Sequence, residues 1–412
     1  MDASRPVAVV LGQGMAGATS LAVVRDLGRA GIPVVSFSPS RLNPTRHSRY
    51  CAFQHCPDPE REARELLDML IAEAGNHAGR SVLFAIGDAE LVFVTEHAGE
   101  LLRWFLLPDF PRSLASTLMD KYAQIEIVRS LGIDVPATVC PASATESECI
   151  GRELGFPVFV KPRYTRRWPY LGHNKGFVAN NAAELRVRLE WAFAAGFQVL
   201  VQSVIRGPDH NHCSAYCYVG QEPGKDAACS YRILRKYPAG FGFGVLAEST
   251  VEAVLERTSL ELLRSLGLRG VAEVEFKCDE RDGKWRLIEL NPRFSLQHAL
   301  VSAAGVNLAS LEYFDLIGSR STPSSEYRRG VRWTIAGLDL RASVGQWRRG
   351  ELSIRQWARS FQGLRAEALI ARDDPGPALA YVSRSPRYLW EAAFASARAK
   401  PAHQLTSARS GL

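Results

Sequence analysis

Residues 271–293, VAEVEFKCDERDGKWRLIELNPR, constrain the fold of this chain more than any other segment. Two largely apolar runs flank the polar turn ERDG, which predicts a hairpin of two strands. Glu275 lies in the first strand, whereas Glu289 and Asn291 lie two residues apart at the end of the second and so share one face. Three oxygen-bearing side chains beside Arg293 suit Mg²⁺, which proteins hold through one or two carboxylates together with substrate phosphates. On these residues alone, an ordinary polar hairpin face is an equal alternative.

The composition is that of an ordinary globular protein. The chain has 412 residues, of which 46% are hydrophobic and 23% charged, and this length predicts two or three domains. The net charge of +7 fits an anionic substrate or a nucleotide, while the mixture of 50 basic and 43 acidic residues argues against a nucleic-acid partner. The eight cysteines show no disulfide-like framework, and the sequence contains no signal peptide or bilayer-long apolar run. We therefore expect a cytoplasmic protein without a transmembrane segment.

The N-terminal residues predict a small Rossmann-like α/β domain. A buried-type strand at residues 7–11 is followed by GQGMAG, a helical pattern and a second strand at residues 34–37. The turn matches the dinucleotide fingerprint at Gly12, Gly14 and Gly17. The second strand does not end in the acidic residue that binds the ribose, so a nicotinamide cofactor is a minor alternative.

Asp88 follows the next strand, residues 82–86, at the edge where open α/β sheets bind ligands. This position makes Asp88 a candidate substrate contact, and the competing interpretation is that it caps the helix that begins near Ala89.

Several basic residues in the middle of the chain are candidate anion ligands. Lys161 ends a buried strand, and Lys175 lies at the end of an irregular loop, residues 164–177, that would cover an anion. In YRILRKYPAGFGFG, three basic residues precede a loop rich in Pro, Gly and aromatic residues: Arg232, Arg235 and Lys236. They predict either a recognition loop for a carboxylate or phosphate or a solvent-exposed strand edge with a flexible turn.

The segment DHNHCSAYC offers a minor zinc alternative through His210, His212, Cys213 and Cys217. Its spacing fits no common zinc pattern, and the residues that follow alternate like a strand.

Five motifs in order now resemble those of the ATP-grasp superfamily. They are Lys121 in MDKYAQ, Lys161 in VFVKPR, the hinge VQSVIRGPD, the hairpin strand with Glu275, and ELNPR with Glu289, Asn291 and Arg293. The resemblance covers about residues 113–318. It implies an α/β and α+β multidomain protein, in which an ATP-grasp fold follows a small Rossmann-like pre-ATP-grasp domain. The expected domains are residues 1–112, residues 113–320 and a C-terminal extension, residues 321–412. The second domain divides into a lysine-bearing subdomain, residues 113–200, and a metal-binding subdomain, residues 201–320.

The resemblance also implies roles for individual residues. Phosphate groups of ATP would be held by Lys121, Lys161 and, in the loop, Lys175. Gln202 would contact the adenine amino group, the backbone near Val204 and Ile205 would line the hinge, and Asp209 would bind the ribose hydroxyls. Glu275, Glu289 and Asn291 would bind one or two Mg²⁺ ions. Arg293 would contact the transferred phosphate.

Gln297 argues against carboxylase chemistry within the superfamily. Its carboxylases tend to place a Glu base four residues after the position of Arg293, and an amide cannot accept a proton in this way. The loop RKYPAGFGFG and the tail motifs WTIAGLDL, GELSIRQWARS and RDDPGPAL resemble bacterial carboxylate–amine ligases that include D-aspartate ligase-like proteins. The resemblance implies an enzyme that activates a small-molecule carboxylate as an acyl phosphate and joins it to an amine, releasing ADP and phosphate. A nucleotide-binding regulator without catalysis is the alternative, and a carbamoyl-phosphate-synthase-like or carboxylase-like enzyme is a further one.

The last 90 or so residues are rich in Arg and contain Trp347, Trp357 and Trp390. We expect amphipathic helices that pack on the core, with contact to an anionic membrane surface or polymer as a minor alternative. A homodimer is compatible with the sequence.

Overall fold

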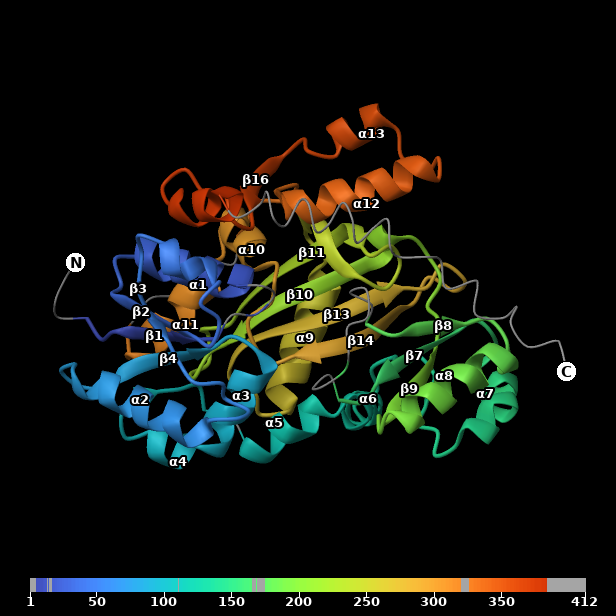
Figure 1. Cartoon of the computed structure of the whole chain (residues 1–412), viewed down its shortest axis with the longest axis horizontal. Helices are drawn as coiled ribbons and strands as arrows, with labels where there is room; N and C mark the ends of the chain where they lie inside the picture. Colours follow the sequence, from blue (N-terminus) through green and yellow to red (C-terminus); the bar gives the residue numbers. More distant parts are fainter. Residues whose placement is uncertain are drawn as a thin grey trace, which may run out of the picture.

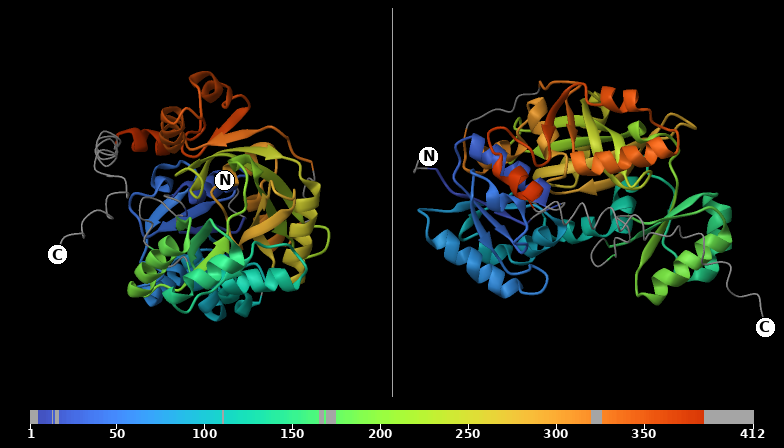
Figure 2. Two further views of the ribbon diagram at one scale, coloured as in Figure 1. Left: turned by 90° about the vertical axis from the view of Figure 1, so that its right-hand side faces the viewer. Right: turned by 45° about the horizontal axis from the view of Figure 1, so that its top comes forward.

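Three β-sheets organise the chain (Figure 1). The computed structural model describes residues 5–12, 14, 17–109, 111–164, 168, 175–319 and 326–383. Within these ranges, sheet A has the strand order β3-β2-β1-β4-β5, sheet B has β6-β9-β7-β8, and sheet C has β14-β13-β10-β11-β12-β15-β16. Figure 2 shows the parts that contain sheet A and sheet B at opposite ends of the molecule, both beside the large sheet C.

Sheet A is parallel throughout and forms the predicted Rossmann-like opening. Its strands are β1 (Ala8–Leu11), β2 (Val34–Ser38), β3 (Ala52–His55), β4 (Ser81–Ala85) and β5 (Phe105–Leu106). The helices are α1 (Ala18–Arg29), η2 (Pro44–His47), α2 (Ala63–Gly75), α3 (Asp88–Glu96) and α4 (Ala98–Leu101). Alternate residues of β1 enter two separate cores, because both faces of a parallel sheet are covered by helices.

Sheet B is antiparallel and carries the two segments that flank the expected phosphate loop. Its strands are β6 (Thr138–Val139), β7 (Val158–Pro162), β8 (Phe177–Ala179) and β9 (Val199–Ser203), with helices η3 (Ala144–Glu146), α7 (Ser147–Leu154) and α8 (Ala182–Ala194). Two helices precede it, α5 (Arg112–Met119) and α6 (Lys121–Ser130). Asp120 separates the two helices, because its carboxylate caps α6 by accepting from the N–H groups of Tyr122 and Ala123.

Sheet C contains the hairpin predicted from residues 271–293. Its strands are β10 (His212–Val219), β11 (Ala227–Tyr237), β12 (Phe243–Thr250), β13 (Gly270–Cys278), β14 (Trp285–Asn291), β15 (Arg332–Thr334) and β16 (Leu364–Glu367). Its helices are η5 (Asp209–Asn211), α9 (Ala253–Ser265), α10 (His298–Ala304), α11 (Leu308–Leu316), α12 (Ala336–Arg348) and α13 (Ile354–Arg359). The C-terminal residues therefore add two strands to this sheet as well as helices.

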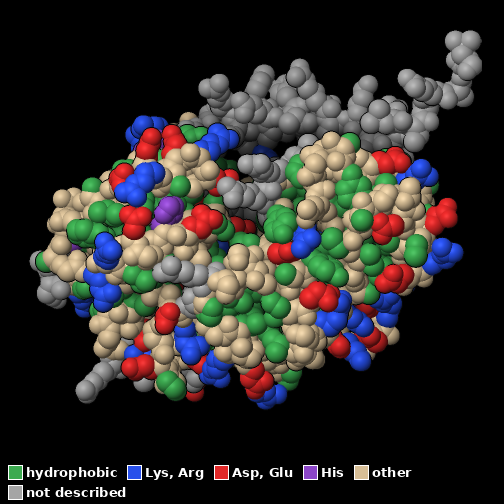
Figure 3. Space-filling model, turned by 90° about the horizontal axis from the view of Figure 1, so that it is seen from below, with side chains coloured by type: hydrophobic (Ala, Val, Ile, Leu, Met, Phe, Trp, Pro, Cys, Tyr) green, Lys and Arg blue, Asp and Glu red, His purple; other side chains and the backbone are tan. Residues whose placement is uncertain are grey.

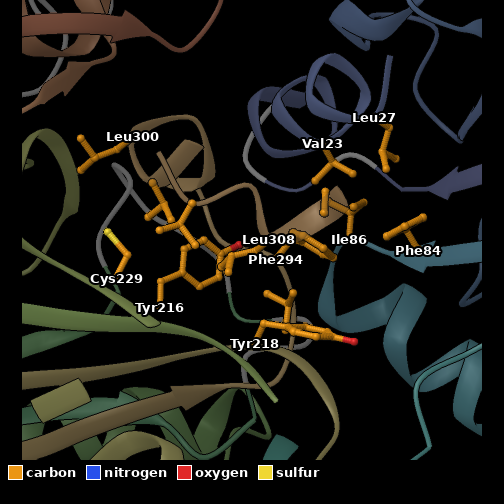
Figure 4. Packing of buried hydrophobic residues seen from close by; sticks show 14 of the residues in the cluster. Val23, Leu27, Phe84, Ile86, Tyr216, Tyr218, Cys229, Phe294, Leu300 and Leu308 are labelled. Atoms are coloured by element: carbon orange, nitrogen blue, oxygen red, sulfur yellow. The ribbon is translucent and has the colours of Figure 1, made fainter. Parts of the chain in front are cut away.

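A single hydrophobic core joins sheet A to sheet C. Side chains from α1 and β4 meet side chains from β10, α10 and α11, as Figure 4 shows for Val23, Ile86, Tyr216 and Phe294. The rings of Phe84 and Phe294 lie 6.0 Å apart between centroids. Phe294 follows Arg293 directly, so this core fixes the end of the hairpin against the N-terminal domain.

None of the helices in the described ranges combines the length and the apolarity that crossing a bilayer requires.

Candidate active site

The hairpin β13–β14 presents four oxygen-bearing side chains on one face. In its register Glu273 lies opposite Asn291, and Glu275 lies opposite Glu289. Residues two apart in a strand share a face, so all four point the same way. They line a cavity of about 480 Å³. The structure thus brings together the three residues that the sequence singled out, and it adds Glu273.

Basic and amide groups contact these carboxylates. The Nδ2 of Asn291 donates to Glu275 over 3.0 Å, and the Nε2 of His212 lies 3.1 Å from the other oxygen of Glu275. Lys121 forms an ion pair with Glu289. The carbonyl oxygen of Asn291 accepts from the guanidinium of Arg293 over 3.4 Å, and its second lone pair can serve a cation.

The two central carboxylates stay ionised despite their burial. Burial raises the pKa of Glu275, but the charge of Lys175 and the hydrogen bond with His212 outweigh it and bring the pKa to about 2. Burial likewise opposes ionisation of Glu289, and the nearby Lys121, Lys175 and Lys161 hold the pKa of Glu289 well below its usual range. Two ionised carboxylates and one amide oxygen on one wall form a hard donor set that fits Mg²⁺.

The neighbouring Glu273 behaves differently. Burial, followed by repulsion from Glu275, raises the pKa of Glu273 to about 7. Its carboxylate accepts from the hydroxyl of Tyr231 and, over 2.6 Å, from the hydroxyl of Ser295. The alternation in VAEVEF contained the signal for this residue, because Glu273 and Glu275 are two apart.

The three predicted lysines come from the part of the chain that contains sheet B. Lys121 is the first residue of α6 and lines the cavity, as does Lys175. Lys161 is buried in β7, where burial and then the charge of Lys121 lower its pKa to about 8. Lysines crowded in this way are electrostatically unfavourable without an anion between them. Most of the loop expected to cover the anion, residues 165–167 and 169–174, lies outside the described residues. Trp390 of the C-terminal extension also lies outside them.

The predicted adenine-binding hinge comprises the end of β9 and the residues after it, and it lies outside the cavity lining. Gln202 is buried and donates its Nε2 to the hydroxyl of Thr138 over 2.9 Å, which leaves its carbonyl oxygen available to accept. Ile205 is buried and Val204 is partly exposed. Asp209 begins η5 and acts electrostatically on Lys236, which lines the cavity.

Arg293 is held by a residue from the N-terminal domain. Its guanidinium pairs with Asp88, and both residues line the cavity. Asp88 is the first residue of α3, and the N-cap is Gly87, so the interpretation of Asp88 as the cap is wrong. Asp88 does reach the cavity, but the contact that the structure gives it is with Arg293.

Two of the three basic residues predicted to bind a substrate point away from the cavity. Arg235 is buried in an ion pair with Asp339 of α12, and Arg232 donates to the hydroxyl of Thr250 over 2.8 Å. Only Lys236 lines the cavity, where burial lowers its pKa to about 8. All three belong to β11, which lies between β10 and β12. The expectations of a recognition loop with three donors and of an exposed strand edge are therefore both wrong.

A backbone irregularity explains which side chain turns inward. The register of β11 against β12 shifts between Ile233 and Arg235 and again between Arg235 and Lys236. A β-bulge changes the alternation of side chains. As a result Tyr231, Ile233 and Lys236 line the cavity together.

The zinc alternative fails on the geometry of β10. Cys213 and Cys217 are buried in an apolar core, whereas His212 lines the cavity and contacts Glu275. Across the described residues, no group of three His, Cys, Asp or Glu side chains converges tightly enough to hold a metal ion. A Mg²⁺ site here consequently needs Asn291 and ligand oxygens in addition to the two carboxylates.

The glycine-rich turn after β1 faces a carboxyl group. Gly12 has a φ of +106°, and a Cβ atom built on it would lie 2.5 Å from the Cδ of Glu90. Glu90 is buried, and burial followed by the charge of Asp88 raises its pKa to about 7. This carboxyl group fills the space at the turn where a dinucleotide pyrophosphate would approach the backbone.

Comparisons with known proteins show which proteins resemble this chain in sequence and in fold. The family model of the carbamoyl-phosphate synthase L chain ATP-binding domain matches residues 245–313, which include the hairpin. The D-aspartate ligase of Enterococcus faecium is 24% identical over 305 residues, covering 71% of this chain and 72% of that protein.

Solved structures agree on the fold. The L-amino acid ligase from Bacillus licheniformis superposes with a TM-score of 0.57 at 16% identity, covering 80% of this chain and 79% of that one. The biotin carboxylase domain of the Hydrogenobacter thermophilus 2-oxoglutarate carboxylase, solved with MgADP and bicarbonate, gives 0.60 at 17% identity, covering 79% and 73%.

The fold is the one that the sequence predicted, an ATP-grasp fold that follows a Rossmann-like domain. Two of the similar proteins are ligases by name, one for D-aspartate and one for L-amino acids.

Proposed function

We propose that this protein is a carboxylate–amine ligase that activates a small acid as an acyl phosphate and transfers the acyl group to an amine. The observation that carries the proposal is the juxtaposition at one cavity of ionised Glu275 and Glu289, Asn291, Lys121, Lys175 and Arg293. Carboxylates and basic side chains that line the same cavity suit a metal–nucleotide complex, because the carboxylates bind the cation and the basic groups bind the phosphates.

Each group has a part in phosphoryl transfer. Glu275, Glu289 and the Asn291 carbonyl oxygen would hold Mg²⁺, which when bound neutralises charge on the phosphoryl oxygens. Lys121, Lys161 and Lys175 bind the phosphates of ATP from the opposite side, and Gln202, Val204, Ile205 and Asp209 contact its adenosine. Arg293 donates hydrogen bonds to the transferred phosphoryl group, where charge develops in the transition state.

The reaction then balances in two displacements. A carboxylate oxygen of the acid attacks the terminal phosphorus, the bond from that phosphorus to the ADP oxygen breaks, and ADP leaves. The amine nitrogen attacks the acyl carbon, the C–O bond to phosphate breaks, and the amine proton passes to solvent. Holding the acid in line with the phosphorus supplies much of the acceleration.

The residue at position 297 favours a ligase over a carboxylase. The amide of Gln297 donates to the carbonyl oxygen of Gly244 over 3.2 Å, and its oxygen lies 3.3 Å from the hydroxyl of Tyr231. It therefore offers no base for bicarbonate. Because Arg232 and Arg235 do not line the cavity, two of the three donors expected for a carboxylate or phosphate are missing from its described wall.

We also propose a domain boundary near residue 112, supported by the separation of the strands of sheets A and B in sequence. The expected boundary at residue 200 falls inside β9, and β15 and β16, beyond the expected boundary at residue 320, belong to sheet C. A cytoplasmic setting is proposed for the reaction, since ATP is consumed and all eight cysteines are free thiols.

Ligand-dependent thermal stability separates this proposal from its rivals. MgATP should raise the melting temperature, because a ligand that binds only the folded state stabilises it by mass action. An acid labelled with ¹⁸O in its carboxylate should pass label to the phosphate product during turnover. Stabilisation by NADP without any by MgATP would indicate a dinucleotide enzyme, and MgATP binding without ADP release for any acid and amine pair would indicate a regulator.

A further inference from the structure

Helix α12 buries two polar side chains, Asp339 and Ser343, and exposes several large apolar ones. Asp339, Ala342 and Ser343 are buried, whereas Leu340 and Trp347 are 52% and 56% exposed. The apolar stripe of a surface helix normally faces the core. The outward face of α12 therefore has the composition of a surface that meets an apolar environment. Trp347, which we expected to pack on the core, belongs to this outward face.

The orientation of α12 is fixed by its inner face. Asp339 forms a buried ion pair with Arg235 of β11 and accepts from the indole N–H of Trp357 over 3.2 Å. The Nε of Arg235 also donates to Gln346 over 3.2 Å. A rotation of the helix that buried Trp347 would expose the pair and leave Arg235 without its partner, so the outward apolar face is built into the fold.

An apolar groove runs between α12 and α13. It has a volume of about 240 Å³, and its apolar lining consists of Leu340, Val344, Trp347, Leu352, Ile354 and Trp357. Ile354 is 70% exposed at its rim. Figure 1 shows the two helices along one margin of the molecule, on the far side of sheet C from α9. We call this feature the α12–α13 groove.

The groove is surrounded by positive charge. Residues 340–365 contain six arginines and one acidic residue, Glu351, which pairs with Arg349 over 2.7 Å. Arg341, Arg348 and Arg355 are exposed, and none of the ion pairs among the described residues involves them. By contrast, Figure 3 shows acidic and basic side chains intermixed over the opposite face of the molecule.

An apolar groove bordered by arginines restricts the kinds of surface that could bind there. A second copy of this chain related by two-fold symmetry would place the same arginines against each other, and like charges repel. A nucleic acid would use the arginines but has no use for exposed Ile354 and Leu340. An anionic membrane surface uses both, because its headgroups attract Arg while Trp and aliphatic side chains enter the boundary with the acyl chains.

We propose that the α12–α13 groove binds the surface of a membrane that contains anionic phospholipid and so attaches the enzyme peripherally. Apolar insertion and charge act together, so binding needs both the exposed side chains and the arginines. The active-site cavity lies on other elements, so attachment leaves catalysis intact.

Vesicle sedimentation of the full chain tests the proposal. We expect binding to phosphatidylcholine vesicles that contain phosphatidylglycerol, little binding to vesicles of phosphatidylcholine alone, and weakening by salt. Each of the single substitutions Arg341→Gln and Arg348→Gln should lower the partition coefficient between anionic vesicles and water about fivefold. The pair Trp347→Ala and Ile354→Ser should lower it at least about tenfold.

A matched variant controls for general effects of lost surface groups. Val254→Ser with Arg257→Gln removes one exposed apolar and one exposed basic residue from α9 and should bind as the wild-type chain does. Turnover and melting temperature report that each variant is folded.

Three results would overturn the proposal: no binding of the wild-type chain to anionic vesicles, equal losses in the α9 control, or self-association that Trp347→Ala disperses. Binding that appears only after truncation beyond Ser383 would also contradict it, since the chain itself would then occupy the groove.

Discussion

Replacing Arg235 should damage stability and leave substrate binding unchanged. The ion pair between Arg235 and Asp339 is almost fully buried, with side-chain exposures of 4% and 1%. Breaking a buried pair by removing one partner leaves the other charge without compensation and costs about 3–5 kcal/mol. We expect Arg235→Met to lower the free energy of unfolding by that amount in urea denaturation. The Michaelis constants for the acid and for ATP should stay within about twofold of wild type, a change of less than ~0.5 kcal/mol.

The partner substitution provides the matched control. Asp339→Leu alone should destabilise the protein similarly, whereas Arg235→Met with Asp339→Leu should recover most of the loss, because an apolar pair can replace a buried ion pair. The reasoning is refuted if Arg235→Met retains wild-type stability while the Michaelis constant for the acid rises more than that for ATP. That outcome would return Arg235 to the substrate site.

Four further changes have defined outcomes. Glu289→Gln should lower kcat at least about 100-fold with the fold retained by circular dichroism, since it removes a charged metal ligand, and near-normal kcat would exclude the hairpin from the mechanism. Asp88→Asn should reduce kcat about 10- to 100-fold, because Asp88 orients Arg293. The same change should lower the free energy of unfolding by less than about 1 kcal/mol, because the ion pair is partly exposed. An unchanged kcat would contradict the role of Asp88 in positioning Arg293. Glu90→Gln should stabilise the protein by up to about 3 kcal/mol near pH 8 but little near pH 5. A carboxyl whose folded pKa is raised to about 7 binds its proton more tightly in the folded state, so stability falls as pH rises toward 7; equal effects at both pH values would refute it. MgATP affinity should weaken as pH rises through about 8, where Lys161 loses its charge, and a flat profile in calorimetry would show that Lys161 does not bind phosphate.

Local patterns in the sequence were enough to predict the hairpin and the N-terminal domain. The period-2 alternation on either side of the turn ERDG places Glu273 with Glu275 and Glu289 with Asn291, whereas the pairing of Glu275 with Glu289 also depends on a bulge after Glu275. The parallel sheet A follows from strands alternating with helical patterns. The same alternation would have identified Glu273, which sequence reasoning missed.

The contacts of Arg235 and Asp88 and the orientation of α12 depend on features that local sequence patterns do not encode. The bulge between Ile233 and Lys236 is a property of the backbone, and simple alternation along β11 would instead place Arg235 on the side of Ile233. The pair between Asp88 and Arg293 joins residues 205 positions apart. The outward apolar face of α12 reverses the usual rule that apolar residues face the core, and only the buried Asp339 reveals the reversal.

The most direct test of the central claim is ADP release from MgATP with a panel of acids and amines, comparing the wild-type chain with Glu289→Gln. The proposed ligase predicts ADP release that requires an acid and an amine together, equals the amide formed, and disappears in the variant. ADP release that is independent of both substrates, or that persists unchanged in Glu289→Gln, would contradict the assignment of this cavity as a ligase active site.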